Sequence, residues 1–160
     1  MPITPFHFGL GAAIHAIAPQ RVSFIAFCSA NVLIDIEPLY YIGTGQFPLH
    51  RFFHTYIGAT LIAMLTIALF CAARGLRLPN LFGWRDLSIA SVAAGAVLGS
   101  YSHVIIDSFM HSDIRPFAPL SESNPLLNLI PLGTLHWSCA FAGAIGIAIL
   151  LLRKLHDERE

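Results

Sequence analysis

The chain alternates between long apolar runs and short connections rich in proline, glycine and charge. Each of four runs approaches the roughly 20 residues that a helix needs to cross the apolar part of a membrane. A fifth run is weaker and only about 13 residues long, so it predicts a short tilted or re-entrant helix. The four strong runs are Val22 to Ile36, Tyr56 to Ala73, Leu87 to Met110 and Leu135 to Leu152, and the weaker one is Phe6 to Ala18.

Helix breakers lie in every connection between these runs. They include Pro19, the stretch from Pro38 to Pro48, Gly75 and Pro79, and the four prolines between 116 and 131. The pattern therefore predicts an all-α protein, a multi-pass transmembrane bundle of about five helices in a single domain that covers residues 1–160.

Composition and charge support a membrane protein. Apolar residues make up 56% of the chain and charged residues 11%, and the mean hydropathy is +0.68, far from the balance of a soluble domain. The formal net charge is zero, so no basic field attracts nucleic acid. We expect membrane lipid, and not nucleic acid, to surround or bind this chain.

The basic residues predict an orientation, because Lys and Arg are retained on the cytoplasmic side of membrane proteins. With a cytoplasmic C-terminus, five crossings leave only Arg51 and Arg115 on the outer side. The cations of the cytoplasmic side are then Arg21, Arg74, Arg77, Arg85, Arg153, Lys154 and Arg159.

The polar side chains inside the runs fall at similar heights. We measure each height from the arginine next to the cytoplasmic end of the same run, at about 1.5 Å per helical residue. His54, His103 and His136 then lie about 26 to 30 Å up, and Asp35 and His7 about 21 Å up. These groups converge near the outer face, where ionisable residues are costly unless they face one another, a ligand or water.

Two pairs among these residues have the spacing of neighbours on one helix face. His103 and Asp107 are four residues apart, and His111 continues the same stripe. His50 and His54 repeat this spacing at the start of the Tyr56 run. Each pair is able to share one metal ion.

Two carboxylates come just before a proline. Asp35 and Glu37 precede Pro38, where we expect the helix to end, so both turn toward the centre only if the last turn unwinds. Imidazole and carboxylate ligands without thiolate suit zinc, manganese or iron. The residues predict a divalent metal site, zinc first, holding one or two ions.

Together these motifs resemble the YdjM-like family of small multi-pass bacterial membrane proteins, described as membrane-bound metal-dependent hydrolases. The resemblance covers about residues 7 to 120. Two details depart from the family pattern: Glu37 stands where the family has a second Asp, and His54-Thr55 stands where it has Thr-His. The matching motifs are His7, Asp35-Ile36-Glu37, His50-Arg51-Phe52-Phe53-His54, His103-Val104-Ile105-Ile106-Asp107 and the proline-containing stretch Arg115 to Pro119.

The resemblance implies a metal-dependent hydrolase in a bacterial membrane. The predicted orientation places its site at the outer face of the inner membrane, and the depth of the polar layer favours a lipid or lipid-linked phosphoester as its substrate. Glu37 would orient or deprotonate the attacking water, and Arg51 and Arg115 would bind phosphoryl oxygens. The expected metal ligands are Asp35, His54, His103 and Asp107, with His7 and His50 as further ligands.

Two alternatives stay open at this point. A membrane metal carrier or sensor would need polar groups through the depth of the bundle, and a haem protein would need two facing histidines but leave the carboxylates unexplained. His111 and His136 are equally compatible with a place in the site or outside it. For His15 we expect a hydrogen bond within the bundle, without a catalytic role.

Overall fold

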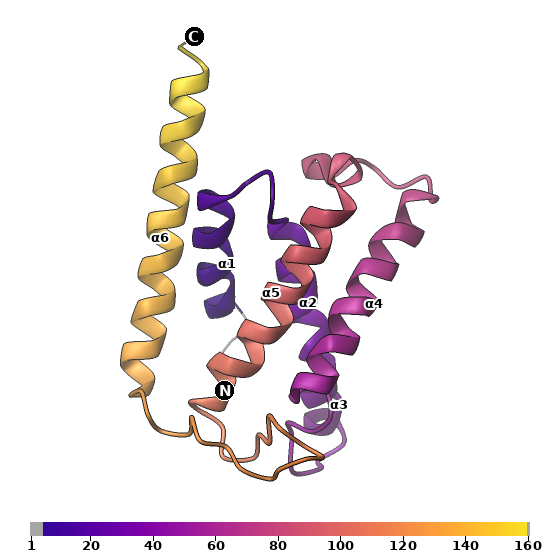
Figure 1. The fold of residues 1–160 in the computed structure, drawn as a ribbon, viewed down its shortest axis with the longest axis vertical. Coiled ribbons are helices and arrows are strands. Elements are labelled where there is room, and N and C mark those ends of the chain that lie inside the picture. The colour runs from indigo at the N-terminus through magenta and orange to yellow at the C-terminus, as the bar shows by residue number, and fades with distance from the viewer. Residues whose placement is uncertain (1–4, 160) are drawn as a thin grey trace.

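The computed structural model describes residues 5–159, which form helices and connections without a β-strand. Along the chain, the helices pass back and forth between the two ends of one bundle (Figure 1). They are α1 (Pro5–Ile17), α2 (Phe24–Ile34), α3 (Ile36–Gly43), α4 (Tyr56–Arg74), the 3-10 helix η1 (Leu81–Asp86), α5 (Ile89–Ser108) and α6 (Leu132–Asp157).

Four helical segments are long and apolar enough to cross a membrane. These are Phe24–Gly43, which joins α2 and α3, and the helices α4, α5 and α6. The all-α bundle predicted from the apolar runs is thereby confirmed, and the four segments overlap the four strong runs. Helix α1 has 13 residues and, as expected, is shorter than a full span.

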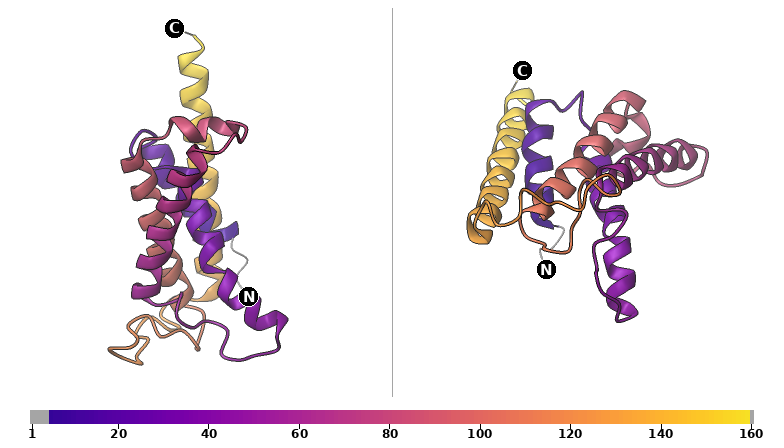
Figure 2. Two further views of the ribbon diagram at one scale, coloured as in Figure 1. Left: turned by 90° about the vertical axis from the view of Figure 1, so that its right-hand side faces the viewer. Right: turned by 60° about the horizontal axis from the view of Figure 1, so that its bottom comes forward.

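Helix α5 lies at the centre of the bundle. Half of its apolar window is buried, against 17 to 33% in the other three segments. It packs against α2 on one side and α4 on another, while α6 packs along α1 (Figures 1 and 2). Residues on α5 are therefore well placed to meet groups from several other helices.

Glycines allow α5 to approach α2 closely. A Cβ atom on Gly95 would meet the backbone of Ser23, and one on Gly99 would meet the backbone of Phe27. Small residues four apart on a membrane helix permit this kind of backbone contact. The close approach brings the last turns of α2 beside the second half of α5.

The helix that we expected to end just before Pro38 ends three residues earlier. Helix α2 ends at Ile34, and Asp35 joins it to α3, whose first turn contains Pro38. Proline is tolerated in a first turn because the amide it lacks would have no helical partner there. The break thus comes at Asp35, and α3 extends outward from the bundle (Figure 2).

The two ends of the bundle differ in composition. The connections 18–23 and 75–88 and the last turns of α6 lie at one end, which we call the basic end. All seven cations predicted to share a side belong to these segments or directly adjoin them, Arg74 as the last residue of α4 and Arg159 just after α6. The connections 44–55 and 109–131 lie at the opposite end (Figure 1), which we call the site end. At the basic end, Arg74 donates a hydrogen bond to the carbonyl of Leu87, linking α4 to the start of α5.

Candidate metal centre

Four side chains from three parts of the chain meet at the site end. Asp35 comes from the joint between α2 and α3, His54 from the connection before α4, and His103 and Asp107 from one face of α5. Each offers a ligand atom within 4.8 Å of the others. The side chains of the two histidines and Asp107 are buried, and that of Asp35 is 19% exposed.

The short distances between these side chains join one ring nitrogen of each histidine to one oxygen of each carboxylate. His103 Nε2 lies 3.1 Å from Asp35 Oδ1 and 3.2 Å from Asp107 Oδ2. His54 Nε2 lies 3.7 Å from each of the same two oxygens. Two ring nitrogens and two carboxylate oxygens therefore surround one small space.

These distances match the edges of a metal coordination shell. Ligands about 2.0 to 2.1 Å from a tetrahedral zinc ion lie about 3.3 Å from one another. Nε2 of His54 and Nε2 of His103 are buried without a hydrogen-bond partner. The His54 nitrogen is too far from the two oxygens for a hydrogen bond, and the His103 nitrogen is near enough but not aligned for one. The residues fit a shared cation in the space between them.

Asn31 determines which nitrogen of His103 faces the site. The Asn31 amide donates to the carbonyls of Phe27 and Gly99, which identifies Oδ1 as the atom that lies 2.9 Å from His103 Nδ1. That oxygen accepts, so His103 carries its proton on Nδ1 and presents the lone pair of Nε2 to the site. This is the tautomer that binds a metal.

Glu37 supports the connection that carries His54. Its carboxylate accepts hydrogen bonds from the backbone N–H groups of Arg51, Phe52 and Phe53, at 2.9 to 3.2 Å. One of its oxygens also lies 3.9 Å from His54 Nδ1, on the side away from the cluster. These contacts favour a positioning role, and water activation by Glu37 stays a prediction.

His7 lies behind the cluster. Its Nε2 is 3.0 Å from Asp107 Oδ1, the oxygen that points away from the other ligands. Its ring stacks on that of His103, with 4.2 Å between the centroids. His7 thus contacts a carboxylate of the cluster and lies outside the four converging atoms, and metal binding by His7 itself stays a prediction.

His50 belongs to a second group beside the first. It meets His111 and Asp113 with ligand atoms within 4.8 Å of one another, and its Nδ1 lies 3.0 Å from Asp113 Oδ1. Its ring also contacts that of His54 edge to face, with 4.6 Å between the centroids. The structure therefore brings His50 and His111 near the metal centre, but into a separate cluster.

In the connections at this end, two histidines have pKa values that lie far from the ordinary value of an imidazole. Burial lowers the pKa of His54, but Asp107, Asp35 and Glu37 raise it more, to about 10. Burial and the charge of His50 lower the pKa of His111 to about 4. Carboxylates thus favour a cation in the first cluster, while His111 stays neutral.

Burial and hydrogen bonds shift the pKa of Asp113 in opposite directions. Burial raises the pKa of its carboxyl group, but bonds from the backbone and ring of His50 and from the backbone of Leu49 lower it more. For His50, burial and the charge of His54 lower the pKa, and Asp113 only partly offsets them. Asp113 is therefore ionised beside a neutral imidazole at neutral pH.

The two arginines expected to bind phosphate have local partners. The guanidinium of Arg51 lies 3.7 Å from the ring centroid of Tyr41 on α3, and its Nε donates to the Pro48 carbonyl. Arg115 donates to carbonyls of its own connection and pairs with Glu122 at 3.6 Å. Both lie in the connections of the site end, and their phosphate contacts stay a prediction.

The remaining histidines of the apolar runs lie outside both clusters. His15 Nδ1 is 2.7 Å from the carbonyl of Val22, which confirms the expected hydrogen bond within the bundle. The ring of His136 stacks on Phe6 with 4.5 Å between centroids.

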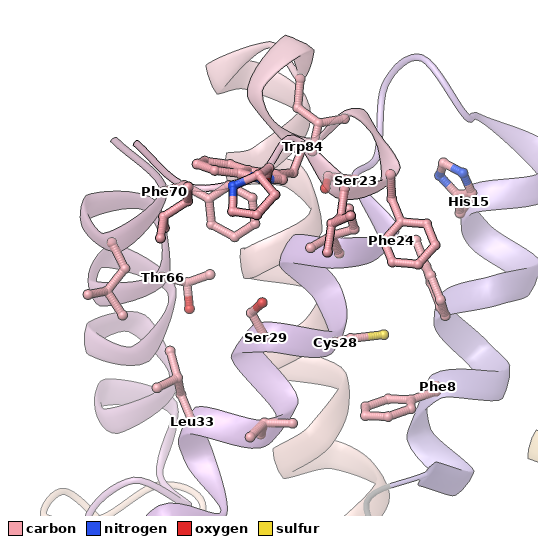
Figure 3. Close-up of a pocket in the computed structure, with 18 residues that line it drawn as sticks. Phe8, His15, Ser23, Phe24, Cys28, Ser29, Leu33, Thr66, Phe70 and Trp84 are labelled. Carbon is pink, nitrogen blue, oxygen red and sulfur yellow. The ribbon is translucent and has the colours of Figure 1, made fainter. Parts of the chain in front are cut away.

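A large apolar pocket lies away from the metal centre, among α1, α2, α4 and η1 (Figure 3). Its volume is about 1170 Å³, and His15, Cys28 and Trp84 are among its lining residues. The lining includes none of the four clustered side chains. Metal chemistry is therefore not located in this pocket.

Two residues of the site were not predicted from the sequence. Asn31 was hidden within an apolar run, where a lone polar residue was the available signal. Asp113 follows His111 at a spacing of two, which was a second signal.

A haem between His54 and His103 has no support, because the oxygens of Asp35 and Asp107 occupy the space between the rings.

The geometry fits a membrane protein with a metal-binding site. Comparison of the chain with protein-family models, with curated proteins and with solved structures finds no match.

Proposed function

We propose that this protein is a membrane-embedded, metal-dependent hydrolase that cleaves a lipid or lipid-linked phosphoester at the outer face of the membrane. The observation that carries the proposal is the convergence of two imidazole nitrogens and two carboxylate oxygens at 3.1 to 3.7 Å. Such a buried group needs a cation to offset its carboxylates, because charges in an apolar environment are costly when unpaired.

The ligand set favours a borderline divalent metal. Two nitrogen and two oxygen donors without thiolate suit zinc, and manganese or iron are compatible. A bound ion of this kind supplies Lewis acidity, which polarises a phosphoryl group and makes water more acidic.

The side chains around the ligands prepare them for this role. Asn31 holds His103 in the metal-binding tautomer, and His7 restrains Asp107 through its second oxygen. Glu37 fixes the connection 51–53 that precedes His54. Arg51 and Arg115 are the cations we assign to the phosphoryl oxygens of the substrate.

The place of the site supports a lipid substrate. The cluster lies at the end of helices that are apolar enough to cross a membrane, so a substrate delivered from the lipid reaches it at the level of the head groups. The resemblance of the motifs to the YdjM-like hydrolases supports hydrolysis over transport. Transport is further disfavoured by α4, which has no ionisable group between its first residue, Tyr56, and Arg74 except Cys71.

The test uses the purified full-length protein in detergent micelles that contain phosphatidic acid, lysophosphatidic acid and a polyprenyl diphosphate. Mass spectrometry follows the lipids, and elemental analysis measures the bound metal. We expect His103→Ala and Asp107→Ala to lose both metal and hydrolysis, while the control Asp86→Asn at the basic end keeps both.

Full hydrolysis by the metal-free protein would end the proposal. Metal binding without cleavage of any of these phosphoesters, together with metal uptake by vesicles that contain the protein, would favour the carrier instead.

A further inference from the structure

We propose that His50, His111 and Asp113 bind a second divalent metal ion beside the first, so that the site is binuclear. The proposal extends the metal centre of the proposed function, but it does not depend on hydrolysis. Its basis is the three-residue cluster at the site end, which contains one carboxylate and two imidazoles with ligand atoms within 4.8 Å of one another.

The backbone orients the carboxylate of this second cluster. Asp113 Oδ2 accepts hydrogen bonds from the N–H groups of Leu49 and His50, at 2.9 and 3.1 Å. The other oxygen, Oδ1, is thereby turned toward the His50 ring. A carboxylate fixed through one oxygen and presented through the other is typical of a metal ligand.

The second observation is an imidazole nitrogen without a partner. His111 Nε2 is buried and accepts or donates no hydrogen bond among the described residues. The His111 ring lies against His50, with 4.2 Å between the centroids. A hydrogen bond between His50 and Asp113 alone would leave His111 unsatisfied, whereas a shared ion would satisfy both imidazoles.

The two clusters adjoin each other through His50 and His54, whose rings are in edge-to-face contact. They differ in their number of protein ligands and in exposure. The first has four ligands, so water or a phosphoryl oxygen joins that ion only as a fifth ligand, and the second has three, which leaves a fourth position for water or substrate. His111 and Asp113 are only partly buried. We therefore assign the substrate-facing position to the second ion.

The experiment is a titration of the metal-free, full-length protein with Co²⁺ in detergent, followed by visible absorption and by elemental analysis after dialysis. We expect two ions per chain. The first equivalent should produce the intense absorption of a four-coordinate ion, and the second a weaker band because more than one water joins its three protein ligands and raises its coordination number above four.

Variants assign the second ion to its ligands. Asp113→Asn and His111→Ala should each reduce the stoichiometry from two to one and leave the first, intense band within threefold of its original affinity. His103→Ala should remove the first band. Asp86→Asn and His156→Ala, at the basic end, are the matched controls and should keep two ions.

One ion per chain in the wild type at saturating Co²⁺ would overturn the proposal. So would two ions in both Asp113→Asn and His111→Ala, or the loss of both ions in variants whose circular dichroism shows intact helices. A failure of the hydrolysis assay would leave the metal count unchanged, so the two proposals fail separately.

Discussion

At the scale of single residues, the candidate metal centre depends on side chains that do not themselves face the space between the four ligand atoms. Asn31 is fully buried and connects α2 to α5 through its bonds to the Gly99 carbonyl and to His103. Outer partners of this kind orient a histidine ligand and raise its basicity. The affinity of the site is therefore expected to respond to Asn31 even though it contributes no ligand.

Replacement of Asn31 tests this role. We expect Asn31→Ala to weaken zinc binding by about 10- to 100-fold, because His103 then loses the acceptor that fixes its tautomer. Asn31→Asp keeps that acceptor and should restore most of the affinity. Competition with a chromophoric chelator measures the affinity, and Ser29→Ala on the same helix is the control. Equal weakening by Asn31→Asp and Asn31→Ala would show that packing, and not the tautomer, decides the affinity.

The sequence predicted which residues carry the site better than it predicted how they act. Asp35, His54 and His103 were grouped from their heights, because helices of regular rise bring similar heights together. Asp107 was added because it lies four residues after His103 on the same helix face. The contacts of Glu37 with three backbone amides could not be predicted in the same way. They depend on the path of a connection, for which the sequence has no comparable periodicity.

At the scale of elements, the apolar runs predicted the helices to within a few residues, but not the joint at Asp35. Pro38 suggested a stop, whereas the chain breaks three residues earlier and resumes as α3. Local preference allows either arrangement, since proline fits the first turn of a new helix. The contacts of Glu37, in the first turn of α3, with the connection 51–53 exist only in the folded chain and favour the second arrangement.

The packing of α5 on α2 provides a prediction at this scale. Gly99→Ala places a methyl group against the Phe27 backbone and should destabilise the fold by about 1 to 3 kcal/mol, as overpacking does. Gly133→Ala, in the first turn of α6, meets open space and is the matched control. Thermal unfolding in detergent measures both, and a zinc titration should show weaker binding for Gly99→Ala alone. Unchanged unfolding of Gly99→Ala would contradict the close approach.

At the scale of the whole molecule, the separation of charge and site between the two ends predicts how the protein lies in a membrane. Cations concentrate in the connections and helix ends of the basic end, and the metal centre occupies the other. Since basic residues are retained in the cytoplasm, the site end should face outward. Two large apolar residues mark the ends: Leu120 is 90% exposed in the connection 109–131, and Phe82 is 93% exposed in η1.

Labelling of cysteines at these two positions tests the orientation. In a chain whose native cysteines are replaced by serine, Leu120→Cys and Phe82→Cys are treated in intact cells with a maleimide that does not cross the cytoplasmic membrane. We expect Leu120→Cys to react at once and Phe82→Cys only after the membrane is permeabilised, because the positive connections hold η1 inside. Both positions are surface-exposed in the fold, so a difference in labelling reports the membrane and not burial. The reverse pattern would place the metal centre at the cytoplasmic face, and its substrate would then have to be a phosphoester of the inner leaflet.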